Sequence, residues 1–157
     1  IEVLGPGTMN TAPVLKDICL AMIGEGKKTV FINLKNCSYV DSTFMGTLVN
    51  IHERYKKVSV EGKLITINLS DEHRKLFKMV GIDKIITTLS DEITVPDFKL
   101  KTIEDCEVER EEKLRVVVEA HEKLVQLNEI NREKFESFLD VVKEEMKEDG
   151  MLHDEAP

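Results

Sequence analysis

The residues best suited to chemistry are Asp41-Ser42-Thr43, in which two hydroxyls follow a carboxylate. They precede a segment whose apolar residues have helical spacing. One interpretation is that these side chains only cap the helix, by accepting hydrogen bonds from its first N–H groups. The other is that one hydroxyl carries a phosphate, because a helix N-terminus offers free N–H groups and partial positive charge. A phosphate would add about −1.5 to −2 charges beside Asp41 and alter a binding face without changing the fold.

Other candidate groups favour structural roles. Residues 24–29 (GEGKKT) resemble a phosphate-binding loop only superficially, because Ala21 stands where the motif needs glycine and the order is helix, loop, strand. None of the histidines forms an HExxH pair, and His52 and His121 lie on predicted apolar faces, where core or interface histidines are usual. No GxSxG sequence is present. We therefore predict a protein that is not an enzyme and has no metal or cofactor site.

The composition predicts a folded intracellular protein. The chain has 157 residues, 41% hydrophobic and 33% charged, which is enough for one domain with an appendage. Its net charge is −8, and the acidity lies beyond residue 96, so nucleic acid is not an expected partner. Widely spaced Cys19, Cys37 and Cys106 indicate neither disulfides nor zinc and favour a reducing compartment. Short apolar runs and the absence of a signal peptide predict a cytoplasmic protein without a membrane span.

Strands and helices alternate through the first 95 residues. The pattern predicts strands at 1–4, 29–34, 64–69 and 85–89, with a loop at 35–38. Helices are expected from Pro13, around Met45, and from Ser70 to a stop at Gly81. This alternation predicts an α/β fold with a largely parallel sheet and right-handed crossovers. We assign residues 1–95 to this domain.

The remaining residues have a different composition. We predict a linker at 96–102, a helical hairpin at 103–149 and a flexible tail at 150–157. The two helices are expected at 103–126 and 129–148, with Asn128 as the cap of the second. Each has one apolar stripe that needs a partner. The helices can pair with each other, lie on the α/β domain, or meet a second chain as a homo-oligomer.

The stretch Tyr39–Gly46 (YVDSTFMG) resembles the D-S-[ST]-G-[LI]-G signature of STAS domains, the anti-sigma-factor antagonist family. Gly5, Asn10-Thr11-Ala12 and the segments TVFINLKNCSYVDST and GKLITINLSDEHRKLFKMVGIDKII also resemble that family in order and spacing, across residues 1–92. The resemblance implies a small parallel or mixed sheet flanked by helices, to which this chain adds a C-terminal helical hairpin. Family members usually carry one more strand before Gly5, so we expect the first strand to be missing from this chain.

The resemblance also implies a function. Bacterial members of the family are protein-binding switches that capture an anti-sigma factor, which is also a Ser/Thr kinase, and so regulate transcription. The kinase phosphorylates the second hydroxyl of the motif, which matches Thr43, and a phosphatase removes the phosphate. Ser42 matches the first hydroxyl and is the alternative acceptor, and Asp41 matches the acidic residue. Phe44 replaces the motif glycine and either hinders a kinase or contacts a different partner.

We therefore predict partner binding through Asp41, Ser42, Thr43 and Phe44, with phosphorylation at Thr43 or Ser42. The alternative is a non-enzymatic STAS scaffold or sensor that assembles through its domain and its C-terminal helices.

Overall fold

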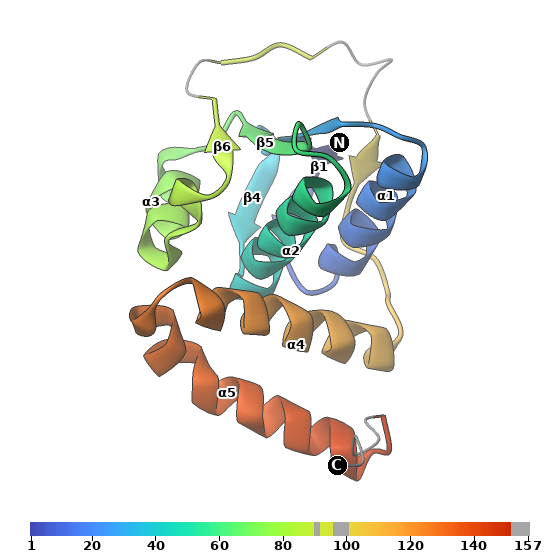
Figure 1. The fold of residues 1–157 in the computed structure, drawn as a ribbon, viewed down its shortest axis with the longest axis vertical. Coiled ribbons are helices and arrows are strands. Elements are labelled where there is room, and N and C mark those ends of the chain that lie inside the picture. The colour runs from blue at the N-terminus through green and yellow to red at the C-terminus, as the bar shows by residue number, and fades with distance from the viewer. Residues whose placement is uncertain (90–91, 96–100, 152–157) are drawn as a thin grey trace.

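A parallel sheet forms one layer of the protein in a computed structural model that describes residues 1–89, 92–95 and 101–151 (Figure 1). Within these residues the sheet has five strands in the order β6-β5-β3-β1-β7, and β2 pairs with β4 in a separate parallel pair. The strands are β1 (Glu2–Val3), β2 (Gly5–Gly7), β3 (Thr29–Asn33), β4 (Cys37–Val40), β5 (Lys63–Ile67), β6 (Thr87–Thr88) and β7 (Thr102–Ile103). The predicted α/β class with a largely parallel sheet is confirmed.

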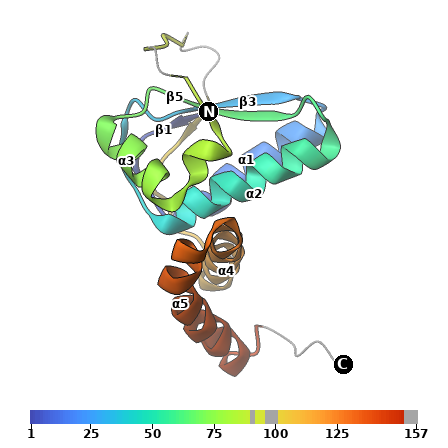
Figure 2. The ribbon, with the colours of Figure 1, turned by 60° about the vertical axis from the view of Figure 1, so that its left-hand side comes forward.

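The helices form further layers on one side of this sheet. They are α1 (Ala12–Gly24), α2 (Ser42–Val58), α3 (Asp71–Val80), the short 3-10 helix η1 (Ile82–Lys84), α4 (Arg110–Leu127) and α5 (Glu129–Glu148). Figure 2 shows the sheet edge-on, with α1, α2 and α3 beneath it, α4 beneath α2, and α5 beneath α4. The C-terminal helices therefore lie against the helical layer, away from the sheet.

Local signals explain where α3 begins and ends and where α5 begins. The Ser70 hydroxyl accepts a hydrogen bond from the His73 N–H at 3.1 Å and so caps α3, and Gly81 ends that helix with φ 79°. The Asn128 side chain accepts from the Asn131 N–H at 2.8 Å and caps α5. The predicted caps at Ser70 and Asn128 and the predicted stop at Gly81 are all confirmed.

A single core joins the sheet to the helices. On β3, Val30 and Ile32 are buried against the helices, while Phe31 between them is 44% exposed on the outer face. The same core contains Val116 and Leu124 of α4. A second apolar cluster fills the interface between α4 and α5 and consists of Val117, Val118, Leu139, Val142 and Met146. The hairpin is thus packed both on itself and on the α/β domain.

In two places the predicted type of element was wrong. The helix expected from residue 103 begins at Arg110, because residues 102–103 form β7 and extend the sheet beside β1. The Glu2 N–H donates to the Lys101 carbonyl and the Leu4 N–H to the Ile103 carbonyl, each at 2.8 Å. Residues 37–38, expected in a loop, belong to β4, which pairs with β2. Residues 96–100 of the predicted linker and 152–157 of the predicted tail lie outside the described residues.

Candidate functional site

Asp41 holds the start of α2 with both carboxylate oxygens. One accepts a hydrogen bond from the Phe44 N–H at 2.7 Å, and the other accepts from the Met9 N–H at 3.0 Å. Burial raises the pKa of Asp41, while the two N–H groups act in the opposite direction. The capping interpretation therefore applies to Asp41. The Phe44 N–H already donates to this carboxylate, so it is not free to bind a phosphate at the start of the helix.

Ser42 forms a hydrogen bond with a helix far away in the sequence. Its Oγ lies 3.0 Å from Nε2 of His121 on α4. The other ring nitrogen of His121, Nδ1, lies 2.8 Å from the carbonyl oxygen of Val117, which can only accept. Nδ1 therefore carries a proton, and because burial lowers the pKa of His121 the ring is neutral near pH 7, so that Nε2 accepts the hydrogen of the Ser42 hydroxyl. The imidazole is 2% exposed, and its ring centroid lies 5.3 Å from that of Phe135 and 4.7 Å from that of Phe138.

This environment predicts a pH dependence for α4. Burial lowers the pKa of His121, although the Val117 carbonyl and the Asp41 carboxylate act in the opposite direction. The unfolded chain therefore binds a proton at this residue at a higher pH than the folded protein does. The stability that the neutral ring supports is complete above about pH 6.5 and falls as the pH drops below that value.

We expect two-dimensional NMR of the imidazole groups to show a His121 pKa below 6.5. Burial also lowers the pKa values of His52 and His73, so His121→Gln is needed to assign the signal. A His121 signal that titrates at or above pH 6.5 would contradict the neutral ring inferred from the burial of the imidazole.

Thr43 and Phe44 point into the protein. Thr43 is 5% exposed, and its carbonyl accepts a hydrogen bond from the Thr47 hydroxyl at 2.8 Å. Phe44 is 0% exposed, and its ring packs so closely on Gly7 that a Cβ atom there would lie 3.2 Å from the ring. The predicted role of Phe44 as a surface contact for a partner is thereby corrected, because its side chain fills the core.

Helix α4 covers the face of α2 that continues from Ser42. At Gly46, one turn later, an added Cβ atom would lie 2.2 Å from the carbonyl oxygen of Ala120, so the two backbones are in direct contact. Further along, the Asn50 amide donates to Glu119 at 2.9 Å, and Lys123 forms an ion pair with Glu53 at 2.6 Å. We call Ser42, Gly46, Asn50 and Glu53 the docking stripe of α2.

Additional contacts hold the hairpin on the domain. Lys16 of α1 forms an ion pair with Glu119 at 2.6 Å. Near the turn between α4 and α5, the buried amide of Asn131 donates to the carbonyls of Val80 and Leu124, each at 2.9 Å. Of the three arrangements left open for the hairpin, the structure shows the helices paired with each other and lying on the domain. Self-association stays a prediction.

Sequence reasoning brought Asp41, Ser42 and Thr43 to one site but missed the residues that cover them. His121 was placed on an apolar face without a named partner, and Glu119 and Asn50 were not singled out. The one sequence signal for the contact with α4 was Gly46, because an isolated glycine inside a predicted helix often marks a close approach of another backbone.

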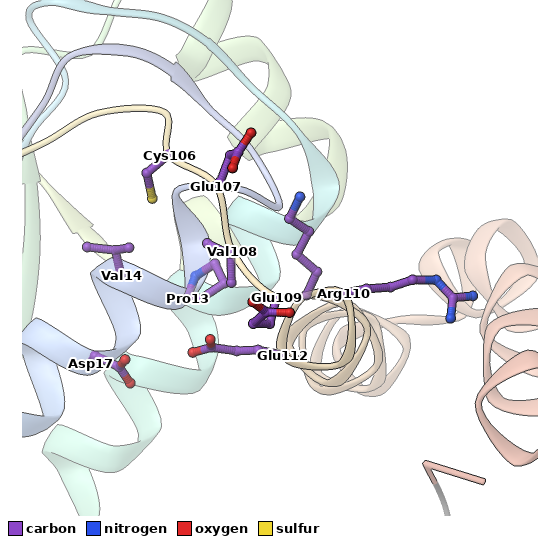
Figure 3. Close-up of a pocket in the computed structure, with 10 residues that line it drawn as sticks. Pro13, Val14, Asp17, Cys106, Glu107, Val108, Glu109, Arg110 and Glu112 are labelled. Atoms are coloured by element: carbon purple, nitrogen blue, oxygen red, sulfur yellow. The ribbon is translucent and has the colours of Figure 1, made fainter. Parts of the chain in front are cut away.

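A pocket lined by described residues lies elsewhere. It has a volume of about 710 Å³ and lies between α1 and the segment that leads into α4. Figure 3 shows Pro13 and Asp17 on one side and Cys106 and Glu112 on the other, while Arg110 extends away toward α5. Arg110 forms ion pairs there with Glu145 and Asp149. No residue of the hydroxyl site lines this cavity.

Two further findings concern the described part of the chain. It contains no group of three or more His, Cys, Asp or Glu side chains that could hold a metal ion. None of its helices combines the length and the apolar character needed to cross a membrane.

Comparison with known proteins covers the α/β domain. The STAS domain family profile matches residues 1–94. An anti-sigma-B factor antagonist of Staphylococcus aureus (strain NCTC 8325 / PS 47) is 29% identical over 90 residues, which are 55% of this chain and 78% of the relative. The anti-sigma-B factor antagonist of Staphylococcus epidermidis is 30% identical with the same coverage.

Among solved structures, the anti-sigma factor antagonist SpoIIAA in its unphosphorylated form matches with 20% identity and a TM-score of 0.46. The match covers 57% of this chain and 76% of that chain. The family profile spans more than half of the sequence and includes the Asp41-Ser42-Thr43 site. The chain therefore belongs to the STAS domain family.

Proposed function

We propose that this protein is an anti-sigma-factor antagonist that acts by binding a protein partner and has no enzymatic activity of its own. The partner is an anti-sigma factor that is also a Ser/Thr kinase, and its capture regulates transcription in the cytoplasm. The observation that carries the proposal is the placement of Asp41-Ser42-Thr43 at the start of α2 in a STAS domain. The similarity to proteins named anti-sigma-B factor antagonist supports the same partner class.

The control of binding is proposed to be phosphorylation of Thr43, with Ser42 as the alternative acceptor and a phosphatase that reverses it. A phosphate on either hydroxyl would place about −1.5 to −2 charges next to the Asp41 carboxylate. Because like charges repel strongly where water is scarce, the modified face would no longer suit the same partner. We propose Asp41, Ser42 and Thr43 as the contact residues; Thr43 is 5% exposed and Phe44 is buried in the core, so contact through Thr43 requires that it first be uncovered.

The test is a binding measurement by calorimetry with the anti-sigma factor kinase encoded in the same genome. Thr43→Ala is expected to bind it as the wild type does, and Thr43→Glu about tenfold or more weakly, because the added charge opposes contact. Ser38→Glu is the matched control, since it adds the same charge at an exposed position of β4. Equal affinities of the two Thr43 variants would mean that Thr43 has a structural role at the start of α2 and does not control binding. Absence of binding by the wild-type chain would refute the proposed function.

One observation favours assembly as a second function. Ile130, Phe138 and Val141 are exposed on α5 although all three are large apolar residues. A scaffold that self-associates through its C-terminal helices would bury them. Light scattering on the full chain tests this alternative, and a monomer mass at high concentration contradicts it.

A further inference from the structure

The C-terminal hairpin lies on the same end of α2 that carries the two hydroxyls (Figure 2). We propose that α4 and α5 form an autoinhibitory cover, such that hairpin docking and a negative charge on Ser42 or Thr43 exclude each other. The docked hairpin shields the hydroxyls, and modification of either one releases the hairpin. The inference rests on the proposed modification site, but its test needs no partner protein.

The Ser42 contact accounts for the sensitivity to charge. The hydroxyl donates its hydrogen to a neutral, buried imidazole, and a phosphate ester at that oxygen has no hydrogen left to donate there. The imidazole cannot move aside freely, because its other nitrogen bonds to Val117 and its ring packs against two phenylalanine side chains of α5. A charged group at Ser42 would thus lie beside the Asp41 carboxylate in a half-buried position, partly shielded from water.

The contact at Gly46 leaves no room for adjustment. With the backbones of Gly46 and Ala120 touching, α4 cannot move closer to α2 or rotate around a flexible side chain at this point. Ser42 precedes Gly46 by one helical turn on the same face, so bulk added at Ser42 must push α4 away as a unit. The adjacent Thr43 is only 5% exposed. A phosphate on its hydroxyl would therefore also have to displace the groups that cover this side chain.

The rest of the interface is suited to release. Two of the four docking-stripe contacts involve charged groups, Asn50 with Glu119 and Glu53 with Lys123, and such groups regain water when they separate. Interfaces of this polar kind resemble transient ones within a chain. The apolar part is formed by Val116 and Leu124, which join the main core and keep the unmodified hairpin docked.

The first test uses hydrogen exchange measured by mass spectrometry on the full chain. In Ser42→Glu and Thr43→Glu, the amides of residues 116–125 are expected to exchange about tenfold faster or more than in the wild type. Ser38→Glu, the exposed control on β4, is expected to leave them unchanged. If the amides of residues 116–125 exchanged in both Glu variants at the same rate as in the wild type, the proposal would be overturned.

A second test does not depend on how well those variants fold. Ser42→Cys introduces a thiol at the half-buried position that α4 contacts, and exposed Cys106 serves as an internal reference while Cys19 and Cys37 are buried. Adding Leu124→Glu, which places a charge at a fully buried position of α4, is expected to speed labelling of the introduced thiol about tenfold or more. Adding Val141→Glu at an exposed position of α5 is expected to have no effect.

Equal labelling rates with Leu124→Glu and Val141→Glu would show that the hairpin does not shield the site. Neither test includes a kinase. Failure to bind an anti-sigma factor would therefore refute the proposed function while leaving the coupling between hairpin and site to be judged by these two results.

Discussion

Phe44→Ala is expected to lower the free energy of unfolding by about 3–5 kcal/mol, the range for removal of a buried aromatic ring. The ring is fully buried and packs against Gly7 at the point where β2 approaches α2. Neither backbone can close the cavity fully, because Asp41 fixes the start of α2 and β2 is paired with β4. Urea denaturation of the full chain measures the loss.

The matched control is Phe31→Ala. Phe31 is 44% exposed on the outer face of β3, so its truncation is expected to cost less than about 1.5 kcal/mol. Phe44→Gly, which restores the glycine of the family signature, is expected to cost about 1 kcal/mol more than Phe44→Ala, since glycine is a poorer helix former. Similar losses for Phe31→Ala and Phe44→Ala would contradict the assignment of Phe44 to the core.

Gly46→Ala is expected to separate α4 from α2 although alanine is the better helix former. Alanine alone would stabilise α2 by about 1 kcal/mol. Its Cβ atom, however, would lie 2.2 Å from the carbonyl oxygen of Ala120, and a backbone atom cannot give way as a flexible side chain can. Overpacking of this kind costs about 1–3 kcal/mol, and here the hairpin can escape it by moving off. Hydrogen exchange of residues 116–125 should therefore accelerate about tenfold or more.

Gly24→Ala provides the comparison for that result. Gly24 ends α1, and no atom lies within 4 Å of a Cβ atom added there, so the substitution is expected to leave the exchange of α4 unchanged. If Gly46→Ala instead stabilised the protein and left residues 116–125 as protected as in the wild type, the close contact between α2 and α4 would be wrong.

The elements that were predicted correctly depend on local signals. Ser70 and Asn128 each cap a helix by accepting a hydrogen bond from the N–H group three residues later, and Gly81 ends α3 in a left-handed conformation. Each could therefore be placed from a few neighbouring residues. Strand β7 could not be placed in that way. It has two residues, too few for a periodic pattern, and forms because β1 offers it a free edge.

Phe44 was misplaced although the sequence carried a usable signal. It shares the spacing i, i+4, i+7 and i+11 with Leu48, Ile51 and Tyr55, which is one face of a helix, and all four side chains are buried. The pairing of Ser42 with His121 is different in kind, because it joins positions 79 residues apart and depends on how a whole hairpin docks.

The most direct test of the account is the rate at which the anti-sigma factor kinase from the same genome phosphorylates three full chains: the wild type, Leu124→Glu and Val141→Glu. We expect mass spectrometry of the peptide containing Ser42 and Thr43 to show phosphate on Thr43. It should appear about tenfold or more faster in Leu124→Glu, where the hairpin is released, than in the other two chains. Absence of phosphate from both hydroxyls in all three chains would contradict the account.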